Sequence, residues 1–241
     1  NIIRGKSELY QHLITTNGQV FINSKNEILS NMAKRFSKPL FYPSQGDYYH
    51  CELLASDPFL KIKAENGDEI TMQLVGGYNF ENAAVALCIG KFFGVDEKLA
   101  NQAVAEYVPG NMRSQIVKKG SNTIILDAYN ANPSSMTAAI ENLAAMNVEK
   151  KVAIVGDMFE LEEEAEAEHR AIGRLLKQKN FDRVYLCGKL MHSAQQEFPN
   201  AILFEKKDDL ISELKKNPIQ NSTVLVKASR GIGLETVVDF L

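Results

Sequence analysis

The chain has 241 residues, of which 45% are hydrophobic and 24% are charged, a balance typical of a soluble globular protein. Its formal net charge of −3 gives no electrostatic basis for binding nucleic acid, and no stretch approaches the ~18 consecutive apolar residues of a membrane span. No secretory signal peptide is visible. Cys51, Cys88 and Cys187 lack metal-binding spacing, so we expect reduced thiols in a cytoplasmic protein. The length favours two domains.

The N-terminal part alternates between helical and extended patterns. Apolar spacing predicts helices over 2–13 and 27–36 and short strands over 19–22 and 39–43. This order is typical of the later part of a larger α/β sheet. Because the chain starts at Asn1 and enters a helix almost at once, we expect it to be a piece of a longer protein.

Residues 60–74 carry the pattern of a β-hairpin. Apolar and polar residues alternate over 60–64 and 69–74, and Asn66-Gly67 lies between the two runs. The helix that follows Gly77 places Asn79 and Asn82 on one face of its first turn. Two such amides suit the edge of a nucleotide base, and a cap with a buried, hydrogen-bonded amide is the alternative.

A second helix, over 97–107, leads to the break Val108-Pro109-Gly110. We predict one domain over residues 1–110 and another over 111–241. Enzymes that close on their substrates need a hinge, and we place it at 108–112.

After this break, strand and helix patterns alternate regularly. Units of this length predict a mostly parallel sheet covered on both faces, which makes the second domain Rossmann-like and the fold class α/β. The expected strands cover 114–117, 123–126, 151–155, 183–186, 201–204 and 223–226, and the expected helices cover 134–146, 162–177, 191–197 and 207–214.

Polar residues gather directly after the predicted strand at 123–126. Asp127, Tyr129 and Asn130 come first, and Asn132 with Pro133 has the pattern of a helix N-cap and first helical residue. Ligands usually bind where parallel strands end, so this turn is a candidate site. A well-made turn and cap without further function is the alternative.

Two other strand ends are polar. Gly156-Asp157 follows one strand, and an acidic run over 160–168 then leads to His169; we interpret the run as a solvated helix face and His169 as a packed side chain. Lys227 and Arg230 follow the last strand and suit carboxylate or phosphate oxygens, with ordinary surface charge as the alternative.

Together these segments resemble the Mur ligases, and among them the enzymes that add D-alanyl-D-alanine to UDP-N-acetylmuramoyl-tripeptide. The central match is Asp127-Ala-Tyr-Asn-Ala-Asn-Pro133. The supporting matches occur in the order that the family has and span most of the chain: Gly5-Lys-Ser-Glu-Leu-Tyr10, Tyr78-Asn-Phe-Glu-Asn82, Arg113-Ser-Gln115, Gly156-Asp-Met-Phe-Glu-Leu161 with His169, and Lys227-Ala-Ser-Arg230 with Glu235.

The resemblance implies the second part of a central ATP-binding domain and a C-terminal Rossmann-like domain, without the UDP-binding domain or the Gly-Lys-Thr phosphate loop. It implies a monomeric, ATP- and Mg2+-dependent ligase of peptidoglycan precursor synthesis that acts through an acyl phosphate; the 241 residues alone are expected to be inactive. It also implies site residues: Lys6, carbamylated and holding Mg2+, with Arg113 and Asp127 for catalysis; Asn79, Asn82, Arg113 and Asp127 for the nucleotide; Tyr129, Asn130, Asn132, Lys227 and Arg230 for the substrates.

Three positions depart from the family pattern. Tyr78 stands where His is usual, Leu126 replaces the first of two acids, and Glu162 occupies a common Gly position. Two alternative functions remain open: a Mur ligase that adds a different amino acid, and a non-catalytic nucleotide- or peptide-binding module of the same fold.

Overall fold

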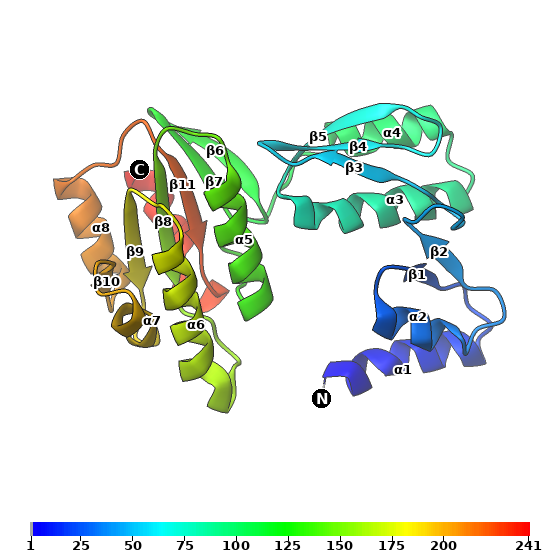
Figure 1. Cartoon of the computed structure of the whole chain (residues 1–241), viewed down its shortest axis with the longest axis horizontal. Helices are drawn as coiled ribbons and strands as arrows, with labels where there is room; N and C mark the ends of the chain where they lie inside the picture. Colours follow the sequence, from blue (N-terminus) through cyan, green and yellow to red (C-terminus); the bar gives the residue numbers. More distant parts are fainter. Residues whose placement is uncertain (1) are drawn as a thin grey trace. The chain divides into compact units, whose positions relative to one another are not determined.

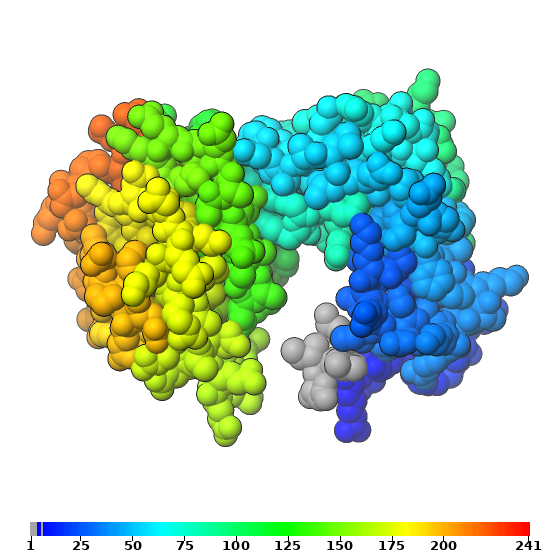
Figure 2. All heavy atoms as spheres, viewed as in Figure 1, coloured from blue at the N-terminus to red at the C-terminus, as the bar shows by residue number. Residues whose placement is uncertain are grey.

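The computed structural model describes residues 2–241, except for the side chains of Ile2, Ile3 and Lys6. Contacts divide the chain into two compact units (Figure 1). The first comprises Asn1–Gln73 and Gly77–Tyr107, and the second comprises Leu74–Gly76 and Val108–Leu241. On the face shown in Figure 2, side chains fill the spaces between the ribbons of each unit.

The first unit begins with a small α/β segment. Helix α1 (Ile2–Thr15) is followed by β1 (Phe21–Asn23), α2 (Glu27–Ala33) and β2 (Leu40–Tyr42), and β1 and β2 pair in parallel. Val20, Ile22 and Ala33 form a small buried cluster there. Asn26 caps α2, because its side chain accepts a hydrogen bond from the backbone N–H of Leu29.

An antiparallel sheet of three strands follows, in the order β3 (Glu52–Ala55), β4 (Phe59–Lys63) and β5 (Glu69–Val75). Burial alternates along β4 and β5, as period-two patterning requires. The 3₁₀ turn η1 (Gly77–Asn79) then leads into α3 (Phe80–Phe92) and α4 (Glu97–Glu106). Asp96 caps α4 by accepting from the N–H groups of Lys98 and Leu99.

The second unit is built on a sheet of six strands in the order β10-β9-β8-β11-β7-β6. Only the β6–β7 pair is antiparallel. The strands are β6 (Gln115–Lys119), β7 (Asn122–Leu126), β8 (Lys151–Gly156), β9 (Arg183–Cys187), β10 (Ile202–Phe204) and β11 (Thr223–Lys227). The last strand, β11, lies between β7 and β8. Because these three strands are parallel, their carboxyl ends lie at the same edge of the sheet.

Helices cover both faces of this sheet (Figure 1). Alternate strand residues point to opposite faces, so each face has its own core. One core joins the sheet to α5 (Pro133–Ala145), α6 (Ala165–Gln178) and α7 (His192–Glu197). The other joins it to α8 (Lys207–Lys216) and to the C-terminal 3₁₀ segment η4 (Leu234–Phe240). The remaining short turns are η2 (Glu162–Glu164) and η3 (Arg230–Ile232).

The predicted fold class is confirmed: the architecture is α/β, with an antiparallel hairpin in the first unit and a mostly parallel sheet in the second. Two elements have no counterpart among the predictions. Strand β3 is exposed at all its residues, and so shows no alternation, and η4 lacks the length and period of an α-helix. Within the part of the chain that the structure describes, no helix is long and apolar enough to cross a membrane.

Candidate functional site

The turn after β7 is fixed by the helix that follows it. Asn132 is the N-cap of α5: its side chain accepts from the N–H of Ser135 at 2.8 Å, and Ser135 Oγ in turn accepts from the N–H of Asn132 at 3.1 Å. Asn130 Oδ1 accepts from the N–H of Ala131 at 2.9 Å. Both asparagine side chains are exposed, and the contacts that they make hold the turn in one conformation.

An ion pair lies beneath this turn. Lys227, at the end of β11, is 1% exposed, and its Nζ donates to Asp127 Oδ2 at 2.6 Å and to the carbonyl of Asn130 at 3.1 Å. The Asp127 side chain is 15% exposed, so one end of the pair is buried and the other reaches the surface. We predicted that Lys227 binds a carboxylate of the substrate. In the structure its ammonium is instead paired with the carboxylate of Asp127.

The residues before β6 are held against the same turn. Asn111, Met112 and Ser114 all have positive φ values, of 57°, 58° and 49°, which side chains other than Gly rarely adopt. Two hydrogen bonds hold this strained segment: Ser114 N donates to Asp127 Oδ1 at 3.1 Å, and Tyr129 N donates to the carbonyl of Met112 at 3.2 Å. Strain of this kind persists where surrounding structure enforces it, often at functional sites.

Arg113 projects from this strained segment onto the ring of Tyr129, with its guanidinium carbon 3.9 Å from the ring centroid. The guanidinium carbon of Arg230 lies 5.2 Å from the same centroid. Both arginines are exposed and Tyr129 is half-buried. No carboxylate in the described part of the chain pairs with either guanidinium. Two cations therefore lie beside one ring near the carboxyl ends of β7 and β11, and neither forms an ion pair within the part of the chain that the structure describes.

The end of β8 is built differently. Asp157 is buried, and its Oδ1 accepts from the N–H of Met191 at 3.0 Å. Burial raises the pKa of this carboxyl, opposed by hydrogen bonds from the backbone N–H groups of Leu190 and Met191. A Cβ at Gly156 would lie 2.8 Å from the Cβ of Ala228 and 2.9 Å from the carbonyl of Cys187, so the strand ends need Gly to pack this closely.

His169 completes this structure. It is fully buried, its Nε2 accepts from the N–H of Met158 at 3.0 Å, and its Nδ1 donates to the carbonyl of Ala165 at 2.6 Å. Ser229, which we did not single out from the sequence, links the two strand ends, since its Oγ accepts from the N–H of Phe159 and donates to the carbonyl of Ala131. Its position in the sequence, between Lys227 and Arg230, could have identified Ser229 as a candidate site residue.

The predicted site residues thus fall into two groups, one in each unit. Arg113, Asp127, Tyr129, Asn130, Lys227 and Arg230 come together in the second unit, beside the cap residue Asn132. In the first unit, Asn82 Nδ2 donates to Asn79 Oδ1 at 3.1 Å, with Asn79 buried and Asn82 exposed. The side chain of Lys6 lies outside the described residues.

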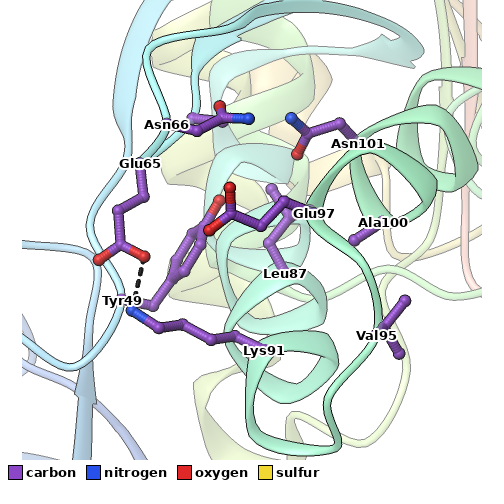
Figure 3. Close-up of a pocket in the computed structure, with 10 residues that line it drawn as sticks. Tyr49, Glu65, Asn66, Leu87, Lys91, Val95, Glu97, Ala100 and Asn101 are labelled. Carbon is purple, nitrogen blue, oxygen red and sulfur yellow. Dashed lines mark hydrogen bonds and ion pairs between the residues drawn. The ribbon is translucent and has the colours of Figure 1, made fainter.

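Two of the cavities lie away from this site. One in the first unit has a volume of about 20 Å³, room for about a single water molecule (Figure 3). Lys91 at its rim pairs with Glu65 at 2.6 Å. A hollow of about 330 Å³ in the second unit lies at the amino ends of β8 and β9, beside Lys150, Asp182 and Arg183, opposite the end where α/β sheets bind ligands.

A cluster for a metal ion is not present among the described residues: no three His, Cys, Asp or Glu side chains are grouped so that they could hold one. The predicted Mg2+ ligand, Lys6, is not tested by this finding, because its side chain is not described.

An open, mostly parallel sheet that presents arginines at its strand ends defines an α/β domain suited to binding phosphate-bearing or carboxylate-bearing ligands. Comparison with known proteins agrees. Residues 112–230 match the family described as "Mur ligase, glutamate ligase domain".

Curated relatives have the same specific name, UDP-N-acetylmuramoyl-tripeptide--D-alanyl-D-alanine ligase. The Bacillus subtilis protein is 34% identical over 173 residues, which are 68% of this chain and 38% of the relative. The Escherichia coli protein is 35% identical over 175 residues, or 70% of this chain and 38% of the relative. The Rickettsia prowazekii protein is 24% identical over 260 aligned positions, covering 99% of this chain and 56% of the relative.

Solved structures share the fold. MurF from Acinetobacter baumannii superposes with a TM-score of 0.81 at 24% identity, covering 98% of this chain and 54% of that one. MurF from Thermotoga maritima, solved in complex with ADP, superposes with a TM-score of 0.76 at 22% identity, covering 92% of this chain and 52% of that one. The chain belongs to the Mur ligase family. It spans between 38% and 56% of the length of the curated relatives described above.

Proposed function

We propose that this chain supplies part of an ATP-dependent ligase that joins D-alanyl-D-alanine to UDP-N-acetylmuramoyl-tripeptide in peptidoglycan precursor synthesis. The relatives that share this activity in their names support the substrate pair. The observation that carries the proposal is the pair of unbalanced guanidiniums of Arg113 and Arg230 above the Asp127–Lys227 ion pair.

The reaction needs positioning and neutralisation of charge more than covalent help from the protein. A carboxylate of the tripeptide takes the terminal phosphoryl group of ATP, and ADP leaves. The amine of D-alanyl-D-alanine then attacks the acyl phosphate, and phosphate leaves as the amide forms. Negative charge develops on phosphoryl and carbonyl oxygens in these steps, and arginines stabilise such charge.

The residues of this chain fit these roles in the following way. Arg113 binds phosphate oxygens, and Asp127 holds the Arg113 segment through the N–H of Ser114 and accepts from a ribose hydroxyl. Asn79 and Asn82 bind the adenine edge with their amides. On the substrate side, Tyr129, Asn130 and Asn132 line the site, Arg230 binds the dipeptide carboxylate, and Lys227 supports the site through Asp127 and Asn130.

ATP supplies the phosphoryl group that activates the carboxylate. Mg2+ would neutralise its phosphates, and a carbamylated Lys6 has the oxygen donors that this hard cation prefers. The side chain of Lys6 lies outside the described residues, and the family resemblance supports this role.

The 241 residues do not include a Gly-Lys-Thr phosphate loop, so we expect this chain alone to have little ligase activity. The test is phosphate release with ATP, the tripeptide precursor and D-alanyl-D-alanine. Turnover by the complete gene product with background rates from the 241-residue chain is the expected result. Robust turnover by the short chain would contradict the expected inactivity, and no turnover by the complete product would contradict the function.

Two alternatives are tested by the same assay. A ligase that adds a different amino acid would release phosphate with that amino acid and not with the dipeptide. A non-catalytic module would bind nucleotide without releasing phosphate. The Tyr129-Asn-Ala-Asn-Pro133 segment favours the dipeptide enzyme.

We also propose a cytoplasmic monomer with domains over 1–110 and 111–241 and a hinge at 108–112. Solution scattering of the complete gene product should change on addition of nucleotide and substrates; identical profiles would contradict the hinge.

A further inference from the structure

Tyr129 is the one described residue whose ring two arginines share. The guanidinium carbons of Arg113 and Arg230 lie 3.9 and 5.2 Å from its centroid, both within the range of a cation–π interaction. The two guanidinium carbons can therefore be no farther apart than the sum of these distances. Two guanidinium cations repel each other, and the attraction of each to the ring of Tyr129 offsets part of this cost.

Arg113 is fixed at its backbone as well as at its side chain. The strained segment around it is tied down by the hydrogen bonds from Ser114 N to Asp127 and from Tyr129 N to Met112. Tyr129 therefore restrains Arg113 in two ways: its backbone N–H donates to the carbonyl of the preceding residue, Met112, and its ring contacts the Arg113 guanidinium. A side chain so constrained has lost much of the conformational freedom that binding would otherwise remove.

Arg230 starts from an equally fixed point. Ser229 before it is buried, and the N–H of Ser229 donates to the carbonyl of Asp157 at 2.9 Å. Gly233 N donates to the carbonyl of Arg230 at 3.0 Å and closes the short turn η3. Among the described residues, the ring of Tyr129 is the contact that restrains the side chain of Arg230.

We propose that Tyr129 is a positioning residue that aligns Arg113 and Arg230 into one unit for binding a phosphoryl group. The proposal rests on the proposed function and changes it at one residue: Arg230, which the family resemblance assigns to the dipeptide carboxylate, shares a phosphoryl group with Arg113. A carboxylate has two oxygens, which one bidentate arginine can satisfy. A phosphoryl group has three terminal oxygens and up to two negative charges, and it matches two guanidiniums better.

The test uses the 241-residue chain and pyrophosphate as the probe, with calorimetry for affinity and the side-chain NMR signals of the two arginines as site reporters. Both arginine signals of the wild type should shift along one saturation curve. Tyr129→Leu should weaken binding about tenfold, since a cation–π contact is lost at each arginine. Tyr129→Phe keeps the ring and should bind within about twofold of the wild type. Tyr107→Leu is the matched control, because this tyrosine is exposed and its ring contacts no cation in the described part of the chain.

A purely structural role for Tyr129 would not couple the arginines, so the decisive measurement is a mutant cycle. In the wild-type background, Arg113→Gln and Arg230→Gln should be non-additive, with the double variant little weaker than either single variant. In the Tyr129→Leu background the two effects should become additive. Circular dichroism checks that each variant is folded.

Three results would overturn the proposal: additive arginine effects in the wild-type background, unchanged affinity in Tyr129→Leu, and absence of saturable pyrophosphate binding. Inorganic phosphate and D-alanyl-D-alanine serve as further probes, and tighter binding of the dipeptide than of either phosphate would also overturn it. These outcomes are independent of the ligase assay on the complete gene product, so failure of the positioning role and failure of the proposed function can be told apart.

Discussion

Asp127 and Asp157 occupy equivalent places in the sheet. Each follows a parallel strand, β7 or β8, and each of these strands pairs with β11. Yet Asp127 is partly exposed and paired with the ammonium of Lys227, whereas Asp157 is buried and hydrogen-bonded to backbone N–H groups. Asp127 accepts from the N–H of Ser114, the residue next to Arg113, whereas Asp157 is followed by Met158, whose N–H donates to His169.

The difference shows that a polar strand end in an α/β sheet is not by itself a ligand site. At Asp157 every nearby polar group that we have described is used within the fold, so the strand end is structural. At Asp127 the buried groups are used within the fold, and the exposed Arg113 and Arg230 form no ion pair with the described residues, which supports our proposal that they act on a ligand. The two strand ends therefore differ in one respect. The end at Asp127 carries exposed arginines beside a buried network whose polar groups are all hydrogen-bonded, and the end at Asp157 carries no such arginines in the described part of the chain.

The largest effect on stability is expected from Lys227→Met. The Lys227 side chain is 2% exposed, and its loss leaves Asp127 without its partner. Breaking a buried pair on one side costs about 3–5 kcal/mol, so urea unfolding should show a loss of this size. The matched control is Lys119→Met, which breaks the exposed pair with Asp239 and should cost less than about 1 kcal/mol.

The variant with Lys227→Met and Asp127→Leu together should recover part of this loss, because no charge is left unpaired. Equal costs for Lys227→Met and Lys119→Met would show that the ion pair does not hold the turn.

A smaller effect is expected from Asn132→Ala. Removing the cap and its reciprocal bond with Ser135 should cost about 1 kcal/mol in the same unfolding experiment. Asn130→Ala is the control in the same turn: its side chain accepts only from the N–H of Ala131, so it should cost less than about 0.5 kcal/mol. If the order of the two costs were reversed, the assignment of Asn132 as the structural residue of the turn would be wrong.

The smallest effect is a change with pH at Asp157. Its pKa is raised by burial, so the folded-state pKa lies above the unfolded value of about 3.9. The stability that this carboxyl contributes is fully present below the unfolded pKa and is lost as pH rises through the folded pKa. The free energy of unfolding of the wild type, relative to Asp157→Asn, should therefore fall as the pH rises from about 4, the unfolded pKa, through the folded-state pKa. A difference that is constant or rises with pH would contradict the structural account of Asp157.

Much of the second unit could be predicted because its elements carry strong local patterns. The strand at 123–126 is apolar and β-branched, and the acidic run at 160–168 precedes an amphipathic helix, so both elements were found. Strand β3 could not be found, because its residues are all exposed and its place depends on pairing with β4. The order of strands was also out of reach, since β11 inserts between β7 and β8 through contacts distant in sequence.

The site shows the same division. The residue types after β7 and β11 identified the candidate residues, but the partners are about a hundred residues apart, as in the bond between Lys227 and Asp127. Charge alone suggested that Lys227 and Arg230 act as a basic pair. Burial separates them, because Lys227 is enclosed at the base of the site and Arg230 is exposed beside Tyr129. The burial of Lys227 results from contacts in the folded chain, which its residue type does not indicate.

We propose that the strand end at Asp127 acts on ligands and that the strand end at Asp157 is structural. The most direct measurement is kcat/KM for ligation by the complete gene product with Asp127→Asn and with Asp157→Asn, each checked for folding. We expect a loss of more than about 100-fold for Asp127→Asn, because the charge that orders the Arg113 segment is removed, and a change within about threefold for Asp157→Asn. Comparable losses from the two variants, or a greater loss from Asp157→Asn, would contradict it.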